Sequence, residues 1–246
     1  MDKKLLLSKS LANFMKINLE GLNDLVRRFP QAQVQFKQDG SPVTELDLLL
    51  SSHIELLFEE NFPHIHFYSE EKFTELKFPI LALDPLDGTR EYVEGRNEWA
   101  ISLGLFSDQN FRGEGWVYNP MTRECFDHDG VRPLFYSAKE SYSGEVSRSE
   151  WKKDMFKKID QTRFRLTPTG SIAYKLGRLS YGKSDFVVSL FPKNIWDIAG
   201  GTLLCQQAGF KFYSQGEEVK RVRKTYEPPL LWCHEELFPE LSQIYS

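Results

Sequence analysis

The sequence predicts an α/β or α+β fold in which helices and sheets lie in layers. Three observations support this class: segments with helical spacing of apolar residues near the start, short apolar runs bounded by glycine and proline, and alternating strand-like and helix-like segments in the second half. With 246 residues, the chain is long enough for one large domain or two interleaved halves, and too short for several independent modules.

The first part of the chain is predicted to contain two helices. Residues 5–29 carry apolar side chains at helical spacing, and Pro30 ends this pattern. Residues 36–43 include glycine and proline, which favour irregular structure. Thr44 then occupies an N-cap position, and Asp47 follows at the spacing of a capping box. A second helix is therefore expected to begin after Thr44.

Strands are predicted in the segment that follows. Residues 67–68 form a short strand, and residues 78–83 are a continuous apolar run that is typical of a buried strand. Residues 99–106 alternate apolar with other side chains. Residues 116–118 and 124–126 are interpreted as the two strands of a hairpin.

The second half alternates between the two kinds of element. Residues 136–160 are polar and are predicted to be a linker between the two halves of the fold. The halves themselves are predicted as residues 1–132 and residues 133–246. The predicted elements beyond this link are a strand at 164–166, a helix at 171–179, a strand at 185–190 and a helix at 198–208. Gly209 is expected to stop the last helix.

Composition limits the classes of function. The net charge of −4 gives no overall positive field that would attract nucleic acid or an anionic membrane, and no apolar stretch approaches the length of a membrane span. The three cysteines lack a CxxC spacing, which favours a reducing, cytoplasmic setting. An acidic protein that handles an anionic substrate would need basic side chains or metal cations at its site.

The run Asp-Pro-Leu-Asp-Gly-Thr at residues 84–89 is the strongest local feature. Asp84 and Asp87 directly follow a predicted buried strand, and Gly88 permits a tight turn. Such a turn can direct both carboxylates and the carbonyl of Leu86 toward one point, which predicts a site for a hard cation. An ordinary turn stays open as the alternative, because aspartate and glycine are favoured in turns.

Two further acidic positions could join this site. Asp197 is expected in the first turn of a helix capped by Asn194, where its ordinary role would be capping. The small residues 199–201 would allow the start of this helix to approach another backbone closely. Glu70 stands beside a second glutamate at the end of a predicted strand, and the alternative there is a solvated acidic pair.

Taken together, four motifs resemble the inositol monophosphatase superfamily in order and in approximate spacing. The motifs begin at Lys37 (Lys-x-Asp-x-Ser-Pro-Val-Thr-x-x-Asp), Glu70 (Glu-Glu), Asp84 (Asp-Pro-x-Asp-Gly-Thr) and Trp196 (Trp-Asp-x-Ala-x-Gly). Within the superfamily the chain is most similar to the bacterial 3′(2′),5′-bisphosphate nucleotidases, in residues 84–92, 98–100 and 192–197. Inositol monophosphatases place a glutamate that holds sugar hydroxyls where this chain has Leu190. Leu46 and Gly200 also depart from the usual pattern, in which alanine is more common at both positions.

The resemblance implies a layered α-β-α-β-α sandwich of the sugar-phosphatase type and a magnesium-dependent phosphatase. The implied substrate is a small phosphate ester, in particular the 3′-phosphate of adenosine 3′,5′-bisphosphate or of its sulfated form. Inositol 1-phosphate and fructose 1,6-bisphosphate stay open as alternative substrates. A catalytically silent relative that binds a phosphate ligand is a further alternative. Because relatives often form homodimers, a homodimer is expected.

The resemblance also implies a role for each candidate residue. Two or three Mg²⁺ ions would be held by Glu70, Asp84, the Leu86 carbonyl, Asp87 and Asp197. Thr89 and Asp47 would form a short hydrogen-bonded pair that accepts a proton from the attacking water, and Glu70 would assist. The substrate would be bound by residues near the phosphate and the sugar: Lys37, Gly88, Thr89, Arg90, Gly170 and Ser171. The first half would then carry most metal ligands, and the second half Asp197 and substrate-binding loops.

Overall fold

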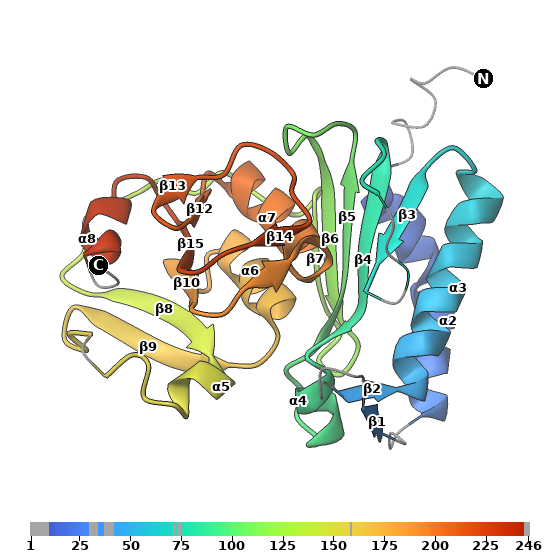
Figure 1. Cartoon of the computed structure of the whole chain (residues 1–246), viewed down its shortest axis with the longest axis horizontal. Helices are drawn as coiled ribbons and strands as arrows, with labels where there is room; N and C mark the ends of the chain where they lie inside the picture. The colour runs from blue at the N-terminus through green and yellow to red at the C-terminus, as the bar shows by residue number, and fades with distance from the viewer. Residues whose placement is uncertain are drawn as a thin grey trace.

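The computed structural model describes residues 10–29, 34–36, 42–70, 72, 75–157 and 159–243. Figure 1 shows two large β-sheets with helices between them and on their outer faces, and two ribbons of two strands each complete the described strands. The predicted layered α+β sandwich is confirmed. The division of the chain at residue 132 into two halves stays a prediction.

The first sheet contains the strands that were predicted between residues 67 and 126. Its order is β3 (His66–Ser69), β4 (Ile80–Asp87), β5 (Ala100–Phe106), β6 (Gly113–Asn119) and β7 (Glu124–Asp127). Strands β3 and β4 are parallel, and the other neighbours are antiparallel. Strand β4 continues beyond the predicted end at residue 83, and its pairing with β5 shifts register between Asp84 and Asp87.

Helices α2 (Leu11–Arg28) and α3 (Glu45–Asn61) cover the outer face of this sheet (Figure 1). The predicted capping box at the start of α3 is confirmed: the Thr44 hydroxyl accepts from the Asp47 N–H, and the Asp47 carboxylate accepts from the Thr44 N–H. A small ribbon of β1 (Val34–Phe36) and β2 (Pro42–Thr44) precedes α3, and its second strand lies mostly in the segment 36–43 that was expected to be irregular.

The second sheet corrects the expectation that residues 136–160 are a linker. Its order is β13 (Glu217–Glu218), β12 (Lys211–Ser214), β15 (Leu230–Cys233), β10 (Phe186–Ser189), β8 (Tyr142–Ser147) and β9 (Phe164–Thr169). Strand β8 pairs in parallel with both β9 and β10, and α5 (Arg148–Trp151) follows it directly. The strand was missed because Glu145 gives it a polar character. This carboxylate is buried and accepts from Arg178 Nε at 2.8 Å, a partner that lies far along the chain.

Helices α6 (Ile172–Ser180) and α7 (Ile195–Ala208) form the middle layer between the sheets (Figure 1). Helix α7 begins directly after Asn194, as the predicted cap implied and three residues before the span of 198–208, and Asn194 and Asp197 form a capping box there. Short elements complete the fold: α4 (Thr89–Val93), β11 (Lys193–Asn194), β14 (Thr225–Tyr226) and α8 (Phe238–Ser242).

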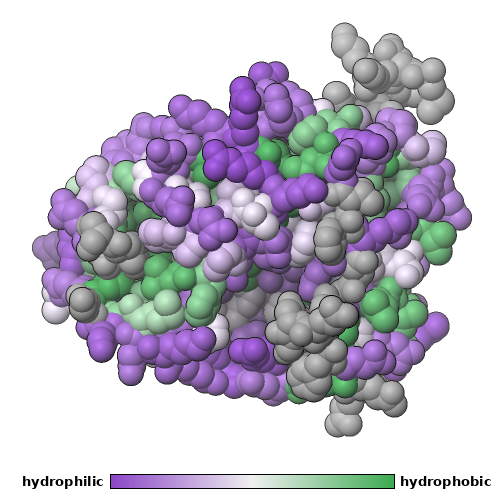
Figure 2. Space-filling model, viewed as in Figure 1, coloured by the Kyte–Doolittle hydropathy of each residue, from purple (hydrophilic) through white to green (hydrophobic). Residues whose placement is uncertain are grey.

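Hydrophilic side chains cover most of the face shown in Figure 2, with smaller hydrophobic areas between them. Such a mixture is ordinary for a globular protein. Among the described residues, the helices are all too short or too polar to cross a membrane.

Glycines allow α7 to lie directly on the first sheet. A Cβ atom added to Gly104 on β5 would lie 2.5 Å from Ala199 Cβ, and one added to Gly115 on β6 would lie 2.2 Å from the Gly200 carbonyl oxygen. The small residues at the start of the helix therefore permit the close backbone approach that the sequence predicted. This contact fixes the first turns of α7, and with them Asp197, relative to the strands.

We expect Gly115→Ala to destabilise the protein by about 1–3 kcal/mol, since the new methyl group would overlap the α7 backbone. The measurement is the free energy of unfolding from urea titration. Gly21→Ala is the matched control: in α2 the added Cβ would have its nearest neighbour, His53 Nε2, at 3.5 Å. That variant should gain up to about 1 kcal/mol from helix propensity. Equal effects at the two positions would contradict the close-packing account.

Candidate metal and phosphate site

A cavity of about 260 Å³ opens where the end of β4 meets the starts of α4, α5, α6 and α7. Its described lining contains side chains of both charges. The acidic ones are Glu70, Asp84, Asp87, Glu91 and Asp197, and the basic ones are Arg90, Arg148, Lys175 and Lys193. The cavity therefore offers ligands for cations next to groups that attract anions.

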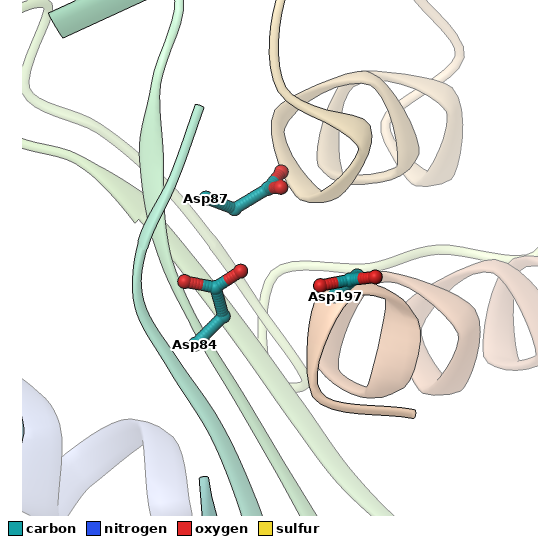
Figure 3. A group of neighbouring side chains, drawn as sticks. All are labelled: Asp84, Asp87 and Asp197. Carbon is teal, nitrogen blue, oxygen red and sulfur yellow. The ribbon is translucent and has the colours of Figure 1, made fainter. Parts of the chain in front are cut away.

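Three carboxylates predicted as metal ligands converge at this cavity. Asp84, Asp87 and Asp197 each offer an oxygen, and these oxygens all lie within 4.8 Å of one another. Figure 3 shows that the two carboxylates from the β4 segment and the one from the start of α7 surround a common space. Asp87 and Asp197, which are 110 positions apart in the sequence, are thus brought together by the packing of α7 on the first sheet.

The end of β4 directs Asp84 and Asp87 to this point. The register shift between them interrupts regular pairing, and the Leu86 N–H donates to Asp84 Oδ1 at 2.9 Å. Gly88 follows with φ of 98°, a left-handed conformation that favours glycine, and caps α4. This geometry turns the chain sharply after Asp87, as the sequence predicted.

Asp197 has both of the roles that were considered for it. It lies in the first turn of α7, and its Oδ2 accepts from the Asn194 N–H at 2.8 Å. Its carboxylate also belongs to the converging group of three. Helix capping and site formation are therefore compatible at this position.

The electrostatics of the three carboxylates disfavour full ionisation. Burial, followed by the charges of Glu70, Asp87 and Asp197, raises the pKa of Asp84 well above its usual value. Burial also raises the pKa of Asp197 to about 7, although Lys193 opposes this shift. For Asp87, burial raises the pKa, and hydrogen bonds from Ser171 and from the Ala173 N–H offset part of the effect. Cations near these oxygens would relieve the repulsion.

The donor set fits magnesium. The three converging carboxylates offer oxygen atoms only, and Mg²⁺ prefers such hard ligands. Leu86, whose carbonyl was predicted to join them, lines the same cavity. Glu70 lines the same cavity but lies outside the group of three. Its charge still acts on Asp84 and Asp197, whose pKa values it raises.

Asp47 and Thr89 are in contact, as the resemblance implied. Thr89 Oγ lies 3.2 Å from Asp47 Oδ1, so the bond is longer than the short one expected. The same hydroxyl lies 3.1 Å from the Leu86 carbonyl oxygen, and the two acceptors share its single proton. Asp47 is almost fully buried, and its other oxygen accepts from the N–H and the hydroxyl of Thr44.

The candidate substrate residues differ in what they contact. Gly88 and Arg90 line the cavity, and Lys37 lies outside the described residues. Gly170 also lines it, but its N–H, which was expected to meet a ligand, donates to Glu98 Oε2 at 2.8 Å. The Ser171 hydroxyl donates to Asp87, so this residue organises an acidic side chain of the site.

Sequence reasoning missed two parts of the cavity wall. The run Ser-Arg-Ser at 147–149 lies in the segment that was interpreted as a linker. Lys175 is fully buried in α6, and its Nζ donates to the carbonyls of the turn 169–171. Its position was a usable signal, because a lysine three residues after Ile172 and four before Leu179 interrupts an apolar helix face.

Comparisons with known proteins agree on a family. The model of the inositol monophosphatase family matches residues 12–236. The chain is 26% identical to inositol monophosphatase 3 of Solanum lycopersicum, over 85% of this chain and 89% of that protein. It is 25% identical to the 3′(2′),5′-bisphosphate nucleotidase CysQ of Haemophilus influenzae, over 71% of this chain and 72% of that protein. The solved structure of an IMPase of Thermotoga maritima has a TM-score of 0.77 at 22% identity, covering 91% of this chain and 92% of that one.

We expect Mg²⁺ to raise the melting temperature, and to raise it more at pH 8 than at pH 5.5. The pKa of Asp197 is raised from 3.8 in the unfolded chain to about 7 in the folded protein. Protonation of Asp197 therefore stabilises the metal-free fold fully below pH 3.8, and this contribution is lost as the pH rises through 7. Protons therefore replace the cation at low pH, whereas at high pH Mg²⁺ binding restores stability. The measurement is a thermal melt with and without Mg²⁺ at both pH values. A shift independent of pH, or one retained in Asp197→Asn, would contradict this account.

Proposed function

Because this chain belongs to the inositol monophosphatase family of magnesium-dependent phosphatases, we propose that it removes the 3′-phosphate of adenosine 3′,5′-bisphosphate or of its sulfated form. One observation carries this proposal: three carboxylates within 4.8 Å of one another border a cavity that basic side chains also line. Cations at the carboxylates would bind the reacting phosphate, and the basic residues would attract the remaining charge of a bisphosphate.

The proposed metal ligands follow the resemblance to the family. Glu70, Asp84 and the Leu86 carbonyl would hold one Mg²⁺, Asp84, Asp87 and Asp197 would hold a second, and a third ion would lie near Glu70; the three aspartates of these sets have oxygens within 4.8 Å of one another. When bound, Mg²⁺ neutralises phosphate charge and makes a water molecule more acidic. The capping and hydrogen-bond contacts of Asp84, Asp87 and Asp197 orient these carboxylates before any ligand arrives.

The proposed proton path runs through Thr89 and Asp47, with Glu70 assisting. The Thr89 hydroxyl would accept a hydrogen bond from the attacking water while it donates its own proton toward Asp47 Oδ1. The two hydrogen bonds from Thr44 hold the Asp47 carboxylate with this oxygen facing Thr89. A threonine alone is a weak base, so the buried carboxylate behind it is essential to this path.

The presence of Leu190 favours a nucleotide as the substrate over an inositol phosphate. Its apolar side chain packs against the cluster of buried residues on the second sheet, and its N–H donates to Glu150 Oε1 at 2.9 Å. A side chain of this kind offers no oxygen to sugar hydroxyls. Inositol 1-phosphate and fructose 1,6-bisphosphate remain the competing substrates, since named relatives include inositol monophosphatases and an enzyme named for both activities.

The setting of the reaction belongs to the same proposal. All three cysteines are free, which supports a reducing compartment such as the cytoplasm. Homodimer formation rests on the resemblance to relatives and is checked by light scattering of the purified protein. We also propose that residues 1–132 supply most metal ligands, and that residues 133–246 supply Asp197 and the loops that contact substrate.

We expect adenosine 3′,5′-bisphosphate to give the highest kcat/KM among the three candidate substrates at saturating Mg²⁺. The physical reason is that the cavity offers guanidinium and ammonium groups but no carboxylate at residue 190 for sugar hydroxyls. Phosphate release is measured in parallel for this nucleotide, inositol 1-phosphate and fructose 1,6-bisphosphate. The highest value for inositol 1-phosphate would refute the substrate assignment, and no release from any of them would revive the silent relative.

Thr89→Ala should lower kcat about 100-fold or more, because the proton path loses its first group. The Mg²⁺-dependent rise in melting temperature should persist, since the three converging carboxylates are retained. Thr122→Ala is the control, because Thr122 is an exposed threonine whose hydroxyl bonds only locally, to Glu124 and the Glu124 N–H. Equal turnover in Thr89→Ala and Thr122→Ala would exclude the proposed path.

A further inference from the structure

We propose that Arg148, held in place by Glu98, binds a second anionic group of the substrate and makes the site select bisphosphates over monophosphates. This inference rests on the proposed phosphatase function and specifies its substrate class. Arg148 lies at the start of α5 and lines the same cavity as the converging carboxylates.

Glu98 fixes the Arg148 side chain. Arg148 Nη2 donates to both Glu98 oxygens, at 2.6 Å to Oε1, and Glu98 Oε2 also accepts from the Gly170 N–H at 2.8 Å. Burial raises the pKa of Glu98, but the hydrogen bonds from Arg148 and Gly170 outweigh it and lower the pKa overall. The guanidinium is thus oriented before a ligand binds, which reduces the entropy lost on binding.

Arg148 still has donors available for a ligand. A guanidinium carries five N–H groups, and within the described part of the chain only those on Nη2 have a hydrogen-bond partner. Nη1 lacks an acceptor there, and Nε is buried without one. The two N–H groups of Nη1 are therefore available, and the oxygens of a bound phosphate would supply their missing acceptors.

The other basic residues of the cavity are less suited to this role. Lys175 is fully buried, and its ammonium donates to the carbonyls of Thr169, Gly170 and Ser171. Lys193 lines the cavity together with Asp197, and its positive charge opposes the rise in the pKa values of Asp87 and Asp197, so it serves these carboxylates.

Arg90 also lines the cavity, but its side chain is exposed, and no contact with the described residues fixes it. Arg148 alone among the described basic residues of the cavity combines a fixed orientation with unused donors.

Within the described residues, Arg148 hydrogen-bonds to Glu98 and not to the three carboxylates. It is linked to them indirectly: Glu98 also accepts from Gly170, and the next residue, Ser171, donates to Asp87. One phosphate at the carboxylates and another at Arg148 would therefore contact different groups of the cavity. A substrate with two separated phosphates fits this arrangement, whereas a monophosphate leaves Arg148 without its anion.

The test compares bisphosphates with matched monophosphates in the full-length protein with Mg²⁺. The pairs are adenosine 3′,5′-bisphosphate with adenosine 3′-monophosphate, and fructose 1,6-bisphosphate with fructose 1-phosphate. The quantity is the ratio of kcat/KM within each pair that the wild type hydrolyses. Both Arg148→Met and Arg148→Gln are measured, so that one folded variant suffices, and thermal melts with Mg²⁺ confirm folding. Arg163→Met is the control, because Arg163 makes a similar ion pair with Glu240 away from the cavity.

We expect the bisphosphate-to-monophosphate ratio to fall at least tenfold in Arg148→Met, which corresponds to about 1.4 kcal/mol of lost discrimination. Arg148→Lys should fall less, because it keeps the charge without the planar fork. Arg163→Met should keep the wild-type ratio. Equal losses on both members of a pair, or a wild type that does not prefer the bisphosphate, would overturn the role of Arg148.

The two proposals fail in different ways. If the wild type hydrolyses the fructose pair and not the nucleotide pair, the nucleotide assignment is wrong, and the ratio for the fructose pair still decides the role of Arg148. If the nucleotide pair is hydrolysed and the Arg148 variants keep the wild-type ratio, the nucleotide assignment stands and the role of Arg148 is wrong.

Discussion

The burial of three neighbouring carboxylates, together with the repulsion between acidic groups, is the constraint on which the rest of the structure depends. Asp84, Asp87 and Asp197 have carboxylate oxygens within 4.8 Å of one another. Burial, and then the charges of Asp87 and Glu70, raise the pKa of Asp197 from 3.8 to about 7, which corresponds to about 4 kcal/mol against the charged form. A fold tolerates such a cost only where backbone geometry holds the groups together and a ligand later offsets their charge. The two sheets and the middle helices supply that geometry.

The rigid part of this arrangement is the contact between α7 and the first sheet. Gly104 and Gly115 leave no space for a Cβ atom, and Gly200 faces them from the helix. The helix start therefore cannot move away from β5 and β6 without losing backbone packing. Glu98 makes a second link across the cavity. It lies in a loop of the first sheet and accepts hydrogen bonds from Gly170 and Arg148, which follow strands of the second sheet.

The sequence could predict those features whose signals are local. The tight turn at Gly88, the capping box of Thr44 with Asp47, and the placement of Asp197 in the first turn of α7 all depend on residues within a few positions of one another. The converging carboxylates became predictable only through the resemblance, since spacing along the chain does not show that Asp84 and Asp197 meet.

The features that were missed depend on partners far apart in the sequence. Strand β8 contains the buried Glu145, whose charge is paired with Arg178, and the adjoining α5 contains the buried Glu150, which accepts from the Ser189 hydroxyl. Both acids resemble solvated residues when the sequence is considered alone. Lys175 differs, because its place on an apolar helix face was a usable signal of burial, whereas the backbone carbonyls that bind its ammonium are not placed by the sequence.

Asp197 limits the evolutionary freedom of the chain at one position. Its carboxylate accepts from the Asn194 N–H and also borders the cation site. Asparagine would retain an oxygen for the cap and lose the charge, whereas glutamate would retain the charge on a side chain one methylene longer. Selection on helix architecture and selection on chemistry therefore act on the same few atoms, and drift to another residue here would have to satisfy both at once.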